Sequence, residues 1–238
     1  MALKDPALYA TRFVVIDFEA VTPRGRRPEP VEVAALAGVI TPEGWQETGR
    51  FETFIEPPAD VPVADLDNPL TGITRAMLAG APTAATALKA LEDRLTRPPY
   101  FLVAQGAHAE AGLIHDQAAA CPTLARIPLL CTVRMAKKLL PDLTRHRLDD
   151  LMAHLAIPAP TGRRHRAMPD VEATRDIFLA LLRMGAENAT FTSLTQLQKI
   201  AEITPKSVLE DAQARAPRQE GLFDLSDPSV SLRAEDLS

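Results

Sequence analysis

The chain has 238 residues, 46% of them hydrophobic, and a net charge of -5. This length is sufficient for one substantial core with appended elements, and no segment approaches the roughly 18 to 20 consecutive apolar residues that cross a bilayer. Since the start MALKDPALYATR lacks the apolar stretch of a signal peptide, and Cys121 and Cys131 lack metal-ligand or disulfide spacing, we expect a cytoplasmic protein without a membrane partner.

The first part of the chain has the pattern of three strands. Residues 12–20, RFVVIDFEA, have the β-branched apolar core of a buried strand, and the Pro, Gly and Arg of residues 21–30 indicate a loop. Residues 31–40 and 47–57 are strand-like runs around the turn residues TPEGWQ. We therefore predict a central strand followed by a hairpin.

Beyond Pro69 the predicted helices alternate with short strands. The expected helices cover residues 74–80, 83–95, 107–120, 133–140, 147–157 and 169–184, and the expected strands cover residues 100–105 and 127–132. Three strands followed by alternating helices and strands indicate an α/β domain with a mixed five-stranded sheet. We assign residues 1–186 to this domain, 187–215 to a short helical extension and 216–238 to a flexible acidic tail.

Two carboxylates stand near the end of the first strand. Asp17 and Glu19 are two residues apart, and because side chains alternate along a strand, both point to the same face. Polar residues entering solvent are the ordinary explanation for such a pair. The apolar run FVVI before them, however, indicates a central strand, whose end is a common place for a site.

A second polar group, HRAMPD, lies at the start of the last long helix. Asp170 falls in the predicted first turn, where a negative charge is favourable by roughly 0.3 to 1 kcal/mol in any case. His165 lies in the preceding loop. Each residue alone is compatible with an ordinary exposed side chain.

Taken together, DFE near the first strand, Glu110 at the start of a middle helix, and HRAMPD before VEATRDIFLALL resemble the three motifs of the DEDDh exonucleases. This family includes the proofreading subunit of bacterial replicative DNA polymerase and RNase T-like exonucleases. The resemblance covers roughly residues 11–184. It implies an RNase H-like fold and a 3'-to-5' exonuclease that releases nucleoside monophosphates from a single-stranded 3' end.

The resemblance also implies a set of site residues. Two cations, Mg²⁺ or Mn²⁺, would be held by Asp17, Glu19, Glu110 and Asp170, with His165 as general base and Glu19 counted with it as a catalytic residue. Two cations about 3.5 to 4 Å apart stabilise charge on the entering and leaving oxygens of a phosphodiester, and Mg²⁺ prefers oxygen ligands. Histidine exchanges protons near neutral pH.

The chain departs from the family pattern around Glu110. The family usually has His-Asn before a Phe-Asp pair, and the aligned positions here are Gln105, Gly106, Ala109 and Glu110. Glutamate keeps the charge and adds one methylene, so it reaches a metal only if the local backbone accommodates it. Phe18 replaces the commoner Thr after the first carboxylate and is the best candidate to touch a base.

Five arginines are candidates for nucleic-acid contacts. Arg163, Arg164 and Arg166 flank His165, and Arg145 and Arg147 would extend the positive track along the backbone of a single strand. Solvated loops are an equally good explanation of both clusters. The aromatic content of 5% does not indicate extensive base stacking.

The tail contains QEGLF at residues 219–223, which resembles the peptide by which bacterial replication and repair proteins bind the sliding clamp. Gln219, Leu222 and Phe223 supply the pattern. An apolar pair in a polar tail suits docking into a partner's pocket, although the pair could also fold back on the domain. The expected partners are therefore a nucleic-acid 3' end and a clamp or polymerase.

Three functions remain open from the sequence. The leading hypothesis is a DNA exonuclease of replication proofreading or repair. The second is a nucleic-acid or partner-binding domain that has lost catalysis through the changes around Glu110. The third keeps the chemistry and acts on RNA, because no feature of the sequence reads the sugar 2'-hydroxyl.

Overall fold

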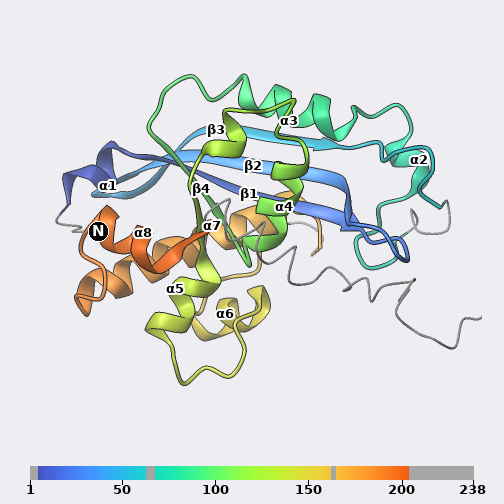
Figure 1. Ribbon diagram of the computed structural model, residues 1–238. Coiled ribbons are helices and arrows are strands. Elements are labelled where there is room, and N and C mark those ends of the chain that lie inside the picture. Colours follow the sequence, from blue (N-terminus) through green and yellow to red (C-terminus); the bar gives the residue numbers. More distant parts are fainter. Residues whose placement is uncertain (1–4, 63–67, 162–164, 204–238) are drawn as a thin grey trace, which may run out of the picture.

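A computed structural model describes residues 5–62, 68–161 and 165–203 of the chain (Figure 1). They form a mixed sheet in the order β3-β2-β1-β4-β5-β6. The strands are β1 (Arg12–Val21), β2 (Glu29–Thr41), β3 (Gly44–Phe54), β4 (Tyr100–Ala104), β5 (Leu129–Cys131) and β6 (Glu202–Ile203). The expected five strands and the hairpin of β2 and β3 are present. The sheet is one strand larger than predicted.

The additional strand is β6, which pairs antiparallel with β5 at the edge of the sheet. It comprises only Glu202 and Ile203 and directly follows a helix. Two residues show no detectable periodicity, so the sequence places them within the short helical extension of residues 187–215.

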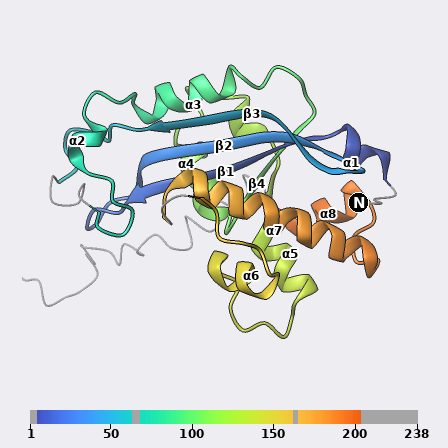
Figure 2. The same cartoon turned by 180° about the vertical axis from the view of Figure 1, so that it is seen from behind.

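Helices cover both faces of the sheet. They are α1 (Pro6–Ala10), α2 (Arg75–Leu78), α3 (Ala84–Glu92), α4 (His108–Asp116), the 3₁₀ helix η2 (Leu124–Arg126), α5 (Thr132–Leu139), α6 (Leu148–His154), α7 (Ala167–Glu187) and α8 (Leu194–Ala201). Helix α4 lies in front of the sheet in Figure 1, and α7 lies in front in the reverse view of Figure 2. Among the helices that the structure describes, none has the length and apolar character of a membrane crossing.

Strand β1 divides the core into two layers because its side chains alternate. Phe13 and Val15 pack with α5, α6, α7 and α8, whereas Val14 and Ile16 pack with α3, α4 and η2. The strand is antiparallel to β2 and parallel to β4. The buried FVVI segment is thus a central strand, as the sequence predicts.

Helix α7 ends in a tight turn that begins at Gly185. The Gly185 carbonyl accepts hydrogen bonds from the amides of Thr190 (2.9 Å) and Phe191 (3.2 Å), and the Phe191 ring is 2% exposed. A Cβ atom built on Gly185 would lie 2.1 Å from Cε2 of that ring. The turn therefore brings an aromatic ring to a place where only glycine fits.

Gly185→Ala is expected to lower the free energy of unfolding by about 1–3 kcal/mol, because overpacking forces the ring or the helix to move. Helix propensity alone would give the opposite sign, a gain of up to about 1 kcal/mol. Urea unfolding followed by circular dichroism measures the difference. Gly112→Ala in α4 is the matched control, since beyond its chain neighbours and the backbone of its own helix nothing lies within 4 Å of the added Cβ. Equal stabilisation by both substitutions would contradict the packing argument.

Candidate active site

Three carboxylates from distant parts of the sequence meet beside the sheet. Asp17 and Glu19 of β1 and Asp170 of α7 each offer an oxygen, and these oxygens all lie within 4.8 Å of one another. Asp17 and Glu19 are partly exposed, and Asp170 is 9% exposed. Three like charges at this separation repel one another, so the arrangement suits a bound cation.

The path of β1 explains how two of these carboxylates reach the site. The last β1–β4 pair is Val15 with Val103, so β1 continues beyond the end of β4. Asp17 and Glu19 have the same alternation as Phe13 and Val15 and therefore face α7. A bulge between Glu19 and Ala20 interrupts the pairing with β2 directly after them. Bulges near sites commonly redirect side chains in this way.

The third carboxylate is positioned by the start of α7. The Asp170 amide donates to the Arg166 carbonyl at 3.2 Å, which closes the first helical turn. A negative charge in this turn is favoured by the helix dipole. The prediction that Asp170 lies in the first turn of the last long helix is confirmed.

Glu110 lies in the first turn of α4 and is not part of this group of three. It is 6% exposed, and burial raises the pKa of its carboxyl to about 7. Within the described part of the chain, its Oε2 atom is buried and has no hydrogen-bond partner. A buried oxygen acceptor without a donor is an atom that a cation can satisfy, so the chemistry of Glu110, like that of the three converging carboxylates, fits a divalent metal ion.

His165 lies two residues before the first residue of α7, next to the N-cap Arg166, and has a positive φ of 60°. Its side chain is partly exposed, five residues before Asp170. A non-glycine residue in the left-handed region is uncommon and is found where surrounding structure holds it in place. The left-handed backbone conformation of His165 therefore marks the end of the loop before α7.

Phe18 lies on the other side of β1 from the acidic group. Its ring is 9% exposed and packs in the layer of α3 and α4 with Val33 and Leu113. The structure therefore does not bring this side chain to the three carboxylates.

The predicted arginines have different surroundings. Arg145 is exposed in the connection between α5 and α6, and Arg147 is exposed at the N-cap of α6. The guanidinium of Arg166 instead pairs with buried Glu32. The remaining predicted residues, Arg163, Arg164, Gln219, Leu222 and Phe223, lie outside the described residues.

Two residues of the region have contacts that the sequence did not predict. Gln105 donates through Nε2 to the His146 carbonyl at 2.8 Å and accepts from the Thr132 hydroxyl, so it ties the connection after α5 to the end of β4. Glu32 anchors the start of α7. The sequence feature that could have pointed to a specific role for Glu32 is that it is the single charged residue within the apolar run VEVAAL.

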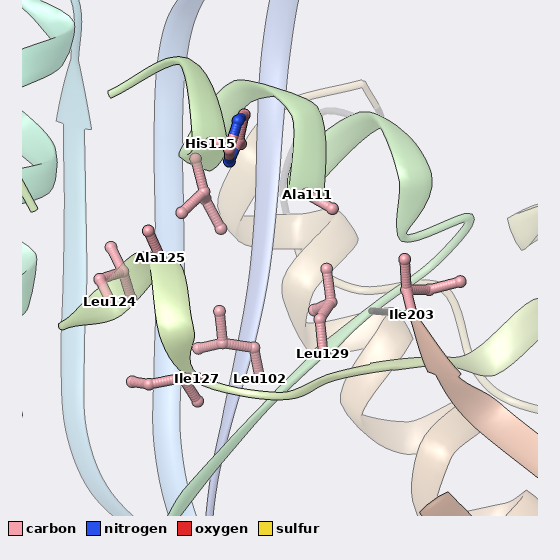
Figure 3. Close-up of a pocket in the computed structure, with 9 residues that line it drawn as sticks. Leu102, Ala111, His115, Leu124, Ala125, Ile127, Leu129 and Ile203 are labelled. Carbon is pink, nitrogen blue, oxygen red and sulfur yellow. The ribbon is translucent and has the colours of Figure 1, made fainter. Parts of the chain in front are cut away.

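A separate small cavity lies beneath α4, between η2 and strands β4, β5 and β6 (Figure 3). Apart from His115, the lining side chains are apolar, with Leu102, Leu129 and Ile203 converging on the space. The cavity measures about 30 Å³, close to the volume of one water molecule. It is too small for a nucleotide and contains none of the four carboxylates.

The sequence of this chain matches a known protein family and several known proteins. The RNase_T family model, described as Exonuclease, matches residues 14–178. The chain is 32% identical to the DNA polymerase III subunit epsilon of Aquifex aeolicus, over 76% of this chain and 85% of that protein. It is 33% identical to a PolC-type DNA polymerase III of Oceanobacillus iheyensis, over 77% of this chain but only 12% of that much longer protein.

The fold also matches solved structures. The nuclease domain of 3'hExo, described as a DEDDh family member bound to rAMP, superposes with a TM-score of 0.62 at 20% identity. The match covers 77% of this chain and 96% of that domain. The mixed sheet flanked by helices is therefore the RNase H-like exonuclease fold that the sequence predicts.

Proposed function

Since the chain belongs to the exonuclease family, we propose that it is a metal-dependent 3'-to-5' exonuclease that releases nucleoside monophosphates from a nucleic-acid strand. The observation that carries the proposal is the meeting of Asp17, Glu19 and Asp170 within 4.8 Å, inside the segment that matches the family. Neither the sequence order nor ordinary surface polarity requires three carboxylates to converge.

Asp17, Glu19, Asp170 and Glu110 would hold divalent cations, Mg²⁺ or Mn²⁺, as the chemistry of their oxygens favours. Such cations, when bound, supply a positive field for the charge that develops on a phosphodiester during hydrolysis. The buried Oε2 of Glu110 is the one of these oxygens shown to have no donor within the described residues. The acidic side chains would orient the cations, and the proton acceptor would be another side chain of this protein.

His165 is the proposed proton acceptor. It lies two residues before Ala167, at the same helix start as Asp170, and its partial exposure lets it pass the proton on to solvent. Imidazole is the side chain that most readily accepts a proton near neutral pH. The water that loses this proton attacks the terminal phosphorus, and the bond from phosphorus to the 3' oxygen of the shortened strand breaks. That 3' oxygen takes up a proton from solvent, and the terminal nucleotide leaves as a monophosphate.

DNA is the proposed substrate, because two of the similar curated proteins are a DNA polymerase III subunit epsilon and a PolC-type DNA polymerase III. RNA is the second candidate, since the matched 3'hExo domain was solved with rAMP. The exposed Arg145 and Arg147 are proposed to contact the strand backbone, together with Arg163 and Arg164. A DNA-directed enzyme of this class would serve proofreading or repair.

A clamp or polymerase is the proposed protein partner. The support is the QEGLF peptide and the similarity to a polymerase subunit, whereas Gln219, Leu222 and Phe223 themselves lie outside the described residues. Alanine at Leu222 and Phe223 should abolish binding to a purified sliding clamp in a surface-binding assay. Unchanged binding would refute the clamp assignment.

The function is tested with matched DNA and RNA oligonucleotides in the presence of Mg²⁺ or Mn²⁺. On strands labelled at the 5' end, we expect a ladder of progressively shorter labelled products, and on strands labelled at the 3' end, immediate release of a labelled mononucleotide. DNA should be degraded at least about tenfold faster, a difference of about 1.4 kcal/mol in activation free energy. Immediate release of a 5' label, or shortening that persists in EDTA, would overturn the proposal.

A further inference from the structure

Glu32 is a buried carboxylate that the proposed chemistry does not use. It is 1% exposed on β2, and Arg166 approaches it with two nitrogens. Nε of Arg166 donates to Oε1 at 3.1 Å and Oε2 at 2.9 Å, and Nη2 donates to Oε1 at 2.5 Å. The backbone amide of Ala167 donates to Oε2 at 3.0 Å. Both oxygens of this carboxylate are therefore satisfied.

The pair lies next to the candidate active site. Glu32 is the direct partner of Glu19 in the antiparallel pairing of β2 with β1, so both side chains stand on the same face. Arg166 is the N-cap of α7, Ala167 is its first residue, and Asp170 follows in the same turn. The Glu32 carboxylate thus joins the strand next to the metal-binding strand to the beginning of the helix that carries Asp170.

The contacts distinguish Glu32 from the proposed metal ligands. Oε2 of Glu110 is buried without a hydrogen-bond partner among the described residues, whereas Glu32 accepts four hydrogen bonds. Glu32 is also not a member of the group formed by Asp17, Glu19 and Asp170. A nearby acid that is neutralised by arginine in this way does not compete for the cations.

The contacts also restrict what Arg166 can do. Its guanidinium lies 5.0 Å from the centroid of the Phe54 ring, in addition to the two-pronged contact with Glu32. Turning this group towards a nucleic-acid phosphate would leave a buried carboxylate without its counter-charge, which is strongly unfavourable. The neighbouring residue, His165, has the positive φ of 60° that such an anchored segment can hold.

We propose that Glu32 and Arg166 are positioning residues that fix Asp170 and His165 relative to Asp17 and Glu19. This role replaces the strand-backbone contact that the sequence suggested for Arg166, and it rests on the proposed exonuclease function. The pair acts through the helix start and touches neither substrate nor cation. Its contribution is to hold the last carboxylate and the proton acceptor in one arrangement before substrate arrives.

Arg166→Lys separates this role from a phosphate contact. Lysine keeps the charge but lacks the planar fork that grips a carboxylate with two donors. We expect kcat to fall at least about tenfold, with KM for the oligonucleotide and its dependence on salt unchanged. A phosphate contact would instead raise KM and reduce the slope of log affinity against log salt by about one, with kcat retained.

Arg175→Lys is the matched control. Arg175 also lies on α7 and also grips a carboxylate with two nitrogens, at 2.8 Å and 2.9 Å to Asp176. It lies more than a helical turn beyond Asp170, so we expect unchanged kcat. Identical kinetics of the two lysine variants, or a change confined to KM in Arg166→Lys, would overturn the proposal.

Two further measurements distinguish a positioning role from a folding defect. The double variant Glu32→Leu with Arg166→Met removes both charges together, so that no unpaired buried charge hinders folding. We expect the double variant to fold, as judged by circular dichroism, and to have a kcat at least about tenfold below that of the wild type, as expected for Arg166→Lys. A wild-type kcat would refute the positioning role. Titration with Mn²⁺ alone, followed by calorimetry, should show at least about fivefold weaker binding in Arg166→Lys and in the double variant than in the wild type. The calorimetry distinguishes the two hypotheses. An inactive wild type would refute the exonuclease function, whereas unchanged Mn²⁺ affinity in the variants would refute the positioning role of Glu32 and Arg166.

Discussion

Asp17→Asn is expected to lower exonuclease turnover at least about 10³-fold while making the metal-free protein more stable. Loss of a charged ligand to the proposed cations would remove several kcal/mol of transition-state stabilisation, and each 1.36 kcal/mol corresponds to a factor of ten in rate. In the absence of metal, the same substitution relieves repulsion with Glu19 and Asp170, whose oxygens lie within 4.8 Å. Like charges at such distances repel by roughly 1–4 kcal/mol near a protein surface.

The two effects are measured on the same samples. Turnover is followed with a labelled DNA strand in Mg²⁺, and the free energy of unfolding is obtained from urea titrations in EDTA. We expect the metal-free variant to gain about 1 kcal/mol and to lose the stabilisation that Mn²⁺ confers on the wild type. Asp142→Asn serves as the control, because Asp142 is exposed and outside the acidic group. A destabilised metal-free Asp17→Asn protein would indicate that Asp17 has a structural role.

Local rules account for the parts of the site that the sequence predicted. Strand alternation places Asp17 and Glu19 on one face, and the helix-start pattern places Asp170 in the first turn of α7. Both inferences need only a few neighbouring residues. The same alternation places Phe18 on the opposite face, where it is buried with α3 and α4. The contact of Phe18 with a base rests on the family resemblance and not on the strand pattern, and it stays a prediction.

Contacts between distant segments account for what the sequence did not predict. Glu32 and Arg166 are 134 residues apart, and nothing in either local pattern pairs them. Arg166 belongs to an obvious basic cluster, which suggested nucleic acid, but burial of Glu32 supplies a stronger partner within the protein. Similarly, the two residues of β6 become a strand only because β5 offers a free edge.

Glu110→Gln is expected to reduce turnover at least about 10²-fold and to stabilise the metal-free protein increasingly as pH rises. Burial raises the pKa of Glu110 from 4.5 to about 7, so folding takes up a proton between these pH values. The wild-type free energy of unfolding should therefore fall as pH increases from 4.5 to about 7 and then level off. At one pKa unit per 1.36 kcal/mol, the full penalty is on the order of 3 kcal/mol, and glutamine does not incur it.

Urea unfolding in EDTA at a series of pH values from 5 to 8 tests this expectation as the difference between wild type and Glu110→Gln. Mn²⁺ should reverse the difference at pH 8, because a cation stabilises the ionised carboxylate and satisfies its unpaired Oε2 atom. Glu110→Asp keeps the carboxylate charge but shortens the side chain by one methylene, so it measures how much the length of the side chain contributes to Mn²⁺ binding and turnover. If Glu110→Gln retained wild-type turnover and Mn²⁺ affinity, Glu110 would be a buried neutral side chain. The cations would then be held by Asp17, Glu19 and Asp170 alone.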